Sequence, residues 1–175
     1  MAVLMLIVGL VVGGLLVGYV FMVVMRNKMI VAHRAEGSFA EVCSRLEETL
    51  KDANGWGQPI PAWEFYGSQI SKGLTYENIR ACKIFFVCKP PYANEVVRDE
   101  ARWAGIMPCS WAIYETMDGQ VYIAKMNIPL MALMMTGVVG RVMKRVAREE
   151  GELLEKVAKA SAARQRVPTA ERAGG

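Results

Sequence analysis

An uncharged, strongly apolar run at the N-terminus limits what this chain can fold into more than any other feature. The first 25 residues, MAVLMLIVGLVVGGLLVGYVFMVVM, contain no charged side chain. At about 1.5 Å per residue, a helix of that length can cross a hydrocarbon core of roughly 30 Å. A secretory signal peptide would instead have basic residues before a shorter apolar stretch and a small-x-small cleavage site after it. Neither feature occurs here, so we predict an uncleaved transmembrane anchor over residues 1–25.

Basic residues on one side of this run predict its orientation. Arg26, Lys28 and Arg34 follow the run, whereas only the terminal amine precedes it. Because basic flanks stay on the cytoplasmic side of a membrane, we expect the N-terminus outside and the following domain in the cytoplasm. Unpaired cysteines agree with that reducing compartment. The opposite orientation would place the domain in the periplasm.

The run also carries glycines at the spacing of helix–helix contacts. Gly9 and Gly13 form one G-x-x-x-G pair, and Gly14 and Gly18 form another. Small residues at this spacing let two membrane helices approach closely. The alternative is that glycine is simply common in membrane helices. We therefore expect the lipid bilayer as one partner, and a homodimer or a membrane protein complex as another.

Composition narrows the function classes for the rest of the chain. The net charge of +4 is too small and too dispersed to indicate nucleic-acid binding. The one histidine, His33, rules out metal or catalytic motifs that need two, and a histidine-dependent mechanism is not expected. None of the four cysteines forms a CxxC pair; they are Cys43, Cys82, Cys88 and Cys109. Acidic residues fall on expected helix faces or in a turn, which gives no support for paired-carboxylate catalysis.

Periodicity divides the remainder into a juxtamembrane segment with a first strand (26–37), a domain (38–160) and a basic tail expected to be disordered (161–175). Further strands are expected over 82–88, 110–116 and 120–125, the last two joined by an Asp118-Gly119 hairpin turn. Ser38 and Glu41 form a capping box that begins a helix. Other helices are expected over 92–103 and 138–163, with basic and acidic residues on a solvated face of the last. Residues 58–65 read as an edge strand interrupted by two prolines, and 67–76 as a short helix and loop.

Two short motifs carry a family resemblance. The strand expected over 82–88 ends at Cys88 and is followed by Lys89, Pro90 and Pro91. A later strand begins with Cys109, directly after Pro108. Together with the hairpin and Met126-Asn127 before an apolar helix, these motifs resemble the bacterial and archaeal family called domain of unknown function 302, over residues 29–159. The resemblance implies a two-layer α+β domain with helices on one face of a mostly antiparallel sheet, often dimeric. It implies no established activity.

This sequence departs from the family at two positions. Lys89 stands where the family usually has asparagine. The asparagine–proline pair before the last helix is separated here by Ile128. Ligand contacts made by the family's asparagine are therefore not carried over.

Cys88 is the strongest candidate for reactive chemistry. It precedes an expected helix N-terminus, where the helix dipole favours a thiolate, and Lys89 adds positive charge. Cys109 would lie beside it if the two strands are antiparallel with these ends together. If they are parallel, about seven residues at ~3.3 Å each would separate the two thiols. The alternative is that both are small buried residues at tight turns.

A methionine-rich segment raises the question of copper, because thioethers are soft metal ligands. The alternative is a flexible apolar filler that packs on the sheet or lies on the membrane surface. The methionines concerned are Met126, Met131, Met134, Met135 and Met143.

Three functions follow in order of preference. The first is a membrane-anchored, non-catalytic binding or accessory domain, with ligand contacts at Cys88 to Pro91 and at Cys109. The second is cysteine-based redox or sulfur transfer centred on Cys88. The third is haem or copper binding by cysteine, methionine or His33. No cofactor, metal site or catalytic residue is assigned.

Overall fold

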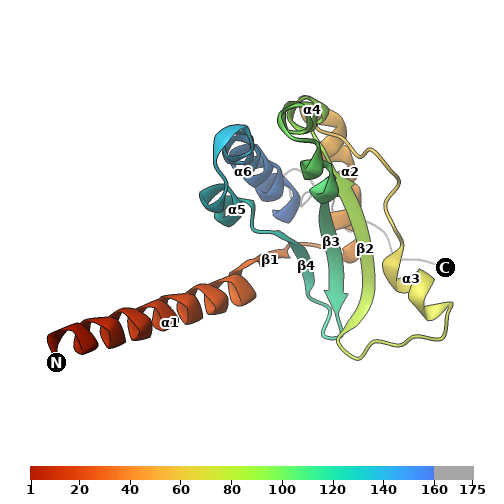
Figure 1. Ribbon diagram of the computed structural model, residues 1–175. Helices are drawn as coiled ribbons and strands as arrows, with labels where there is room; N and C mark the ends of the chain where they lie inside the picture. The colour runs from red at the N-terminus through yellow and green to blue at the C-terminus, as the bar shows by residue number, and fades with distance from the viewer. Residues whose placement is uncertain (160–175) are drawn as a thin grey trace, which may run out of the picture.

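The computed structural model describes residues 1–159 as one long N-terminal helix followed by an α+β domain (Figure 1). The elements in chain order are α1 (Ala2–Lys28), β1 (Ile30–Ala35), α2 (Phe39–Asp52), α3 (Phe65–Ile70), β2 (Ile79–Val87), α4 (Pro90–Asp99), the 3₁₀ helix η1 (Ala101–Ile106), β3 (Cys109–Thr116), β4 (Val121–Met126), α5 (Ile128–Met134) and α6 (Gly137–Ala158). The expected tail at 161–175 lies outside the described residues.

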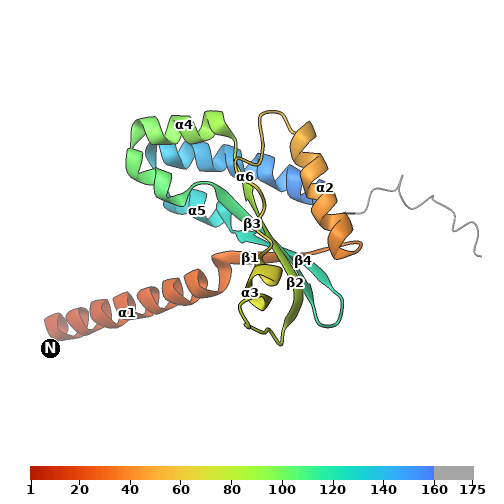
Figure 2. The ribbon, with the colours of Figure 1, turned by 90° about the vertical axis from the view of Figure 1, so that its right-hand side faces the viewer.

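The four strands form one open sheet in the order β1-β4-β3-β2, and every neighbouring pair is antiparallel. Helices α2, α4 and α6 lie over one face of this sheet, as both ribbon views show (Figure 1 and Figure 2). Their buried side chains join those of the sheet in a single hydrophobic core, centred on Phe85, Trp111, Ile113 and Ile123. The expected α+β fold with helices on one face of an antiparallel sheet is confirmed.

Local signals in the sequence explain several element ends. Ser38 accepts a hydrogen bond from the backbone N–H of Glu41, and the Glu41 side chain bonds back to Ser38, which completes the expected capping box of α2. The Asp118-Gly119 pair joins β3 to β4, with Gly119 at φ +82°, a conformation that glycine adopts without strain. Pro90 and Pro91 occupy the first positions of α4, where a missing N–H costs nothing.

Three expected elements are corrected by the structure. The helix expected over 138–163 is α6, which ends at Ala158, because Lys159 after it has an extended backbone. The segment 58–65 is not a strand. It follows the outer edge of β2 with isolated bridges only, at Trp63 and at Gly57 just before the segment, because Pro59 and Pro61 lack the N–H of a regular ladder. The helix expected over 92–103 ends at Asp99, and the chain continues as η1 after an extended Glu100.

Helix α1 stands apart from the core. It projects from the domain (Figure 1), and none of its residues is buried. It runs three residues beyond the expected anchor, to Lys28, with Arg26 and Lys28 in its last turn. One helix of the described chain, this one, is long and apolar enough to cross a membrane.

Candidate functional site

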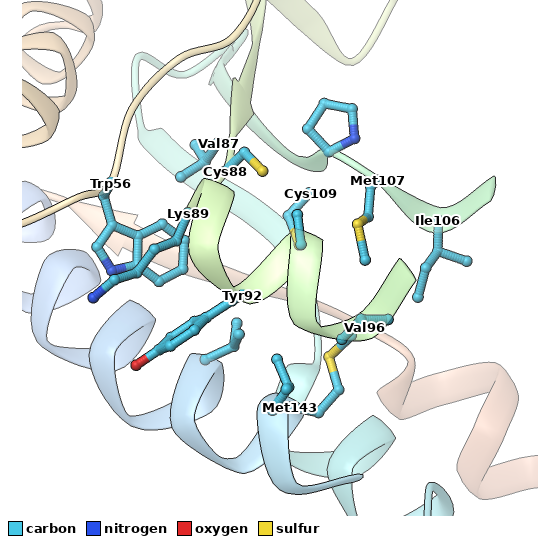
Figure 3. Close-up of a pocket in the computed structure, with 14 residues that line it drawn as sticks. Trp56, Val87, Cys88, Lys89, Tyr92, Val96, Ile106, Met107, Cys109 and Met143 are labelled. Carbon is cyan, nitrogen blue, oxygen red and sulfur yellow. The ribbon is translucent and has the colours of Figure 1, made fainter. Parts of the chain in front are cut away.

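A small cavity lies where β2 ends and β3 begins, under α4 and against α6 (Figure 3). The antiparallel pairing of Val87 with Cys109 brings these strand ends together. Cys88 and Cys109 both line the cavity, so the antiparallel alternative for the two cysteines is the correct one. Its volume is about 40 Å³, and its walls are almost entirely apolar.

Sulfur is unusually frequent in these walls. Cys88, Cys109, Met107 and Met143 all line the cavity, from the end of β2, the start of β3, the loop before it and α6 (Figure 3). Both cysteines are free thiols. The remaining lining includes Val96 and Tyr92 of α4.

Neither thiol is activated. Burial raises the pKa of Cys88, and the backbone N–H of Lys89 only partly offsets this effect. Burial, followed by the negative charge of Glu150, raises the pKa of Cys109 to about 11. The expected stabilised thiolate at Cys88 is therefore wrong, because desolvation outweighs the helix N-terminus.

Lys89 does not stabilise a thiolate at Cys88, because its ammonium group points to α6. Its Nζ lies 2.7 Å from Oε2 of Glu149, and Trp56 Nε1 donates to the same oxygen at 2.9 Å. The Tyr92 hydroxyl donates to Oε1 of Glu149. We call these four residues the Glu149 cluster; three of them, Trp56, Lys89 and Tyr92, also line the cavity.

The Glu149 cluster holds its carboxylate ionised. Burial would by itself raise the pKa of Glu149, but the hydrogen bonds from Lys89, Tyr92 and Trp56 lower it to about 2. The Lys89 ammonium lies 4.8 Å from the centre of the Tyr92 ring, and the Arg145 guanidinium lies 4.7 Å from the same centre. Two cations therefore lie close to the ring of Tyr92, which lines the cavity.

A second cluster lies on the next residue of α6. Glu150 is 1 % exposed; its Oε2 lies 2.7 Å from Nζ of Lys125, and Trp111 Nε1 donates to its Oε1 at 2.6 Å. We call Trp111, Lys125 and Glu150 the Glu150 cluster. It joins the centre of the sheet to α6 behind Cys109.

Sequence reasoning missed both clusters, since it placed these glutamates on a solvated helix face. A signal was present for Glu150. The buried residues of α6 recur at Val139, Val142, Val146, Glu150 and Leu153, so a glutamate occupies a position of the apolar stripe. Lys125 likewise continues the inward alternation of Val121 and Ile123.

The other candidate ligands are dispersed. Within residues 1–159, no group of three or more histidine, cysteine or acidic side chains is placed to hold a metal ion. Of the five methionines considered for copper, only Met143 lines the cavity; Met131 is buried in the core and Met134 is exposed. His33 is exposed on β1, away from the cavity lining.

The anchor glycines make no contact with the domain. A methyl group added at Gly9, Gly13, Gly14 or Gly18 would meet nothing within 4 Å. Their role in helix association stays a prediction.

Comparison with known families decides the relationship. The family model "Domain of unknown function DUF302" matches residues 31–161. The chain belongs to this family. A crystal structure of an uncharacterized conserved DUF302 protein from Bacillus stearothermophilus is similar, with a TM-score of 0.63 and 20% sequence identity. The similarity covers 74% of this chain and 98% of that one, so the Bacillus protein matches the DUF302 domain, and at this identity it supports the fold alone. A comparison with curated proteins gives no match.

Proposed function

We propose that this DUF302 protein is a membrane-anchored, non-catalytic binding domain that uses the cavity between Cys88 and Cys109. One observation carries the proposal: the cavity has a defined apolar interior, yet each ionisable group beside it is already neutral or paired. The pKa values of both thiols are raised, and Glu149 receives three hydrogen bonds. Such a site offers shape and apolar contact without an activated nucleophile or base.

The size of the cavity limits what it can take. Pockets for drug-sized ligands have volumes of roughly 300–1,000 Å³. A space of about 40 Å³ instead suits a small apolar molecule or one side chain of a partner protein. Tyr92 and Trp56 in the lining, each with a polar end hydrogen-bonded to Glu149, would give such a group rigid aromatic contacts.

Helix α1 supports the anchoring part of the proposal. Its 27 residues span about 40 Å, which exceeds the hydrocarbon thickness. A core helix of similar hydropathy would be covered by the domain, whereas α1 has no buried residue. The basic residues in its last turn favour a cytoplasmic domain, and its exposed glycines favour contact with a second copy or another membrane helix.

A blocked cavity tests the proposal. The full-length protein, Ala93→Leu and Asn94→Leu would be purified in mild detergent from native membranes, and bound molecules and proteins identified by mass spectrometry. Ala93 lines the cavity, whereas Asn94 is exposed on the same helix, so the two variants differ mainly in where the leucine points. A species held by wild type and Asn94→Leu but lost from Ala93→Leu supports binding. The same bound species in all three proteins, or none in wild type, contradicts it.

Soft-metal binding is a second candidate, favoured by the four sulfur-bearing residues around one cavity. Thiolate and thioether ligands select Cu(I), and the apolar walls offer nothing to a hard cation. Binding would have to displace the protons of Cys88 and Cys109, so affinity would rise with pH. Competition with a chromogenic Cu(I) chelator tests this candidate. One equivalent retained by wild type and lost in Cys88→Ser, Cys109→Ser supports it, whereas equal retention by both contradicts it.

Cysteine-based redox or sulfur transfer is the remaining alternative from the sequence. It would require Cys88 to ionise near neutral pH, and burial opposes that ionisation. Full retention of the bound species by the Cys88→Ser, Cys109→Ser variant would separate the proposed binding from thiol chemistry.

A further inference from the structure

Helix α5 carries an exposed surface that the binding site does not use. All seven of its residues, Ile-Pro-Leu-Met-Ala-Leu-Met, are apolar. Leu133 is 80% exposed, more than any other large apolar side chain among the described residues after α1, and Met134 beside it is 47% exposed. An apolar helix with no polar outer face is unusual at a water-exposed surface.

The first turn of α5 lies beside the C-terminal end of α1 in space. The Asn127 side chain donates a hydrogen bond to the backbone oxygen of Lys28 at 2.9 Å, and its backbone N–H donates to Met29 at 2.8 Å. The same side chain accepts the bond from Leu130 that caps α5. In both ribbon views α5 lies beside the C-terminal end of α1 (Figure 1 and Figure 2).

The position of α5 is fixed by the domain. Its opposite side buries Ile128, Met131 and Ala132 in the core. The connection to α6 is tight, since a side chain on Gly140 would come within 2.3 Å of the backbone oxygen of Met135. Because Ile128, Met131 and Ala132 are buried on the opposite side, Leu133 faces away from the core.

We propose that the exposed side of α5, with Leu133 and Met134, rests in the interfacial layer of the bilayer from which α1 emerges. This inference rests on the proposed anchoring by α1 and goes beyond it, because a tether alone would leave the domain free to turn above the surface. Apolar side chains that enter the headgroup boundary by roughly 5–10 Å are removed from water, which is favourable. Two contacts, α1 and α5, then fix the orientation of the domain on the membrane.

Photolabelling from the lipid tests this arrangement. The full-length protein would be reconstituted in phosphatidylcholine nanodiscs containing a lipid with a diazirine near the top of its acyl chain. After illumination and trypsin digestion, label is expected in peptide 1–26, which covers most of α1, and in peptide 126–141, which contains α5. Leu133→Asp should reduce the label in 126–141 several-fold and leave that in 1–26 unchanged.

Met117 provides the matched control. It is 57% exposed in the β3–β4 hairpin, which lies at the other end of the sheet (Figure 1), and we expect no label there and no effect of Met117→Asp. Label in 1–26 without label in 126–141 would overturn the inference and leave the anchor standing. Absence of label from 1–26 would instead contradict the anchoring on which the inference rests. Equal label at Met117 and Leu133 would also overturn it, since the probe would then report only exposure.

Discussion

Two consecutive residues of α6 hold the same kind of cluster in different surroundings. Glu149 and Glu150 each pair with a lysine at 2.7 Å and each accept a hydrogen bond from a tryptophan indole. The side chain of Glu149 is 22% exposed at the rim of the cavity, and that of Glu150 is 2% exposed behind the sheet. The same residue types therefore form a partly solvated cluster beside the cavity and a buried cluster that supports the fold.

The difference shows how burial changes what an ion pair does. Water can replace a lost partner of Glu149, because this side chain is partly exposed. Behind the sheet, a charge that loses its partner has no water to solvate it. Breaking the pair therefore costs far more free energy than the intact pair contributes to stability. The predictions below test this contrast, from the largest expected effect to the smallest.

Glu150→Gln should have the largest effect. It leaves the Lys125 ammonium, 5% exposed, without an anionic partner, and we expect the free energy of unfolding to fall by about 3–5 kcal/mol. Denaturant unfolding of the full-length protein in detergent, followed by tryptophan fluorescence, measures this loss. The double variant Lys125→Met, Glu150→Leu should recover most of it, since no charge then remains buried. A loss below about 1 kcal/mol would mean that the pair is solvated.

Glu149→Gln should cost less, about 1–2 kcal/mol. Hydrogen bonds to a charged acceptor contribute about 1.5–3 kcal/mol, and water at the rim offsets part of the loss. The same unfolding measurement applies, with Tyr92→Phe as a control that removes one donor and keeps the carboxylate. An effect equal to that of Glu150→Gln would remove the contrast between the clusters.

Acid should weaken the Glu149 cluster selectively. The folded-state pKa of Glu149 is about 2, below its ordinary value of 4.5, so its contribution is complete above pH 4.5 and is lost as the pH falls towards 2. The stability difference between wild type and Glu149→Gln should therefore shrink between pH 4.5 and pH 2.5 in urea unfolding series. A difference that stays constant over this range would contradict the lowered pKa.

The thiols should show an effect on their own reactivity and not on the stability of the fold. With a pKa of about 11 against an ordinary 9.0, Cys109 should alkylate roughly a hundredfold more slowly at pH 7.5 than in the unfolded chain. Peptide mass spectrometry after iodoacetamide treatment follows each cysteine separately.

Lys89→Ala sharpens the same measurement. Because Lys89 is paired with Glu149 in the folded protein, its removal should leave the alkylation rate of Cys88 nearly unchanged. A marked slowing of Cys88 in this variant would mean that the lysine charge acts on the thiol after all.

Much of the fold could be predicted because its signals are local. The capping box at Ser38, the turn at Asp118-Gly119 and the apolar strand before Cys88 each require only neighbouring residues. The segment with Pro59 and Pro61 was harder, because a chain can follow a sheet edge without forming its ladder. The candidate cysteines were also found from the sequence, although the direction of their pKa shifts was not.

The sequence by itself determined the long apolar helix and the presence of two cysteines at strand ends, since length, periodicity and turn chemistry are properties of adjacent residues. The α+β class followed from the family resemblance of its short motifs. Only the tertiary structure decided that Cys88 and Cys109 line one cavity, that Lys89 pairs across 60 residues with Glu149, and that Glu150 is buried. The physical reason is desolvation: whether a charge or a thiol is stabilised depends on which distant elements exclude water from it, and α6 supplies that exclusion only after it packs on the sheet.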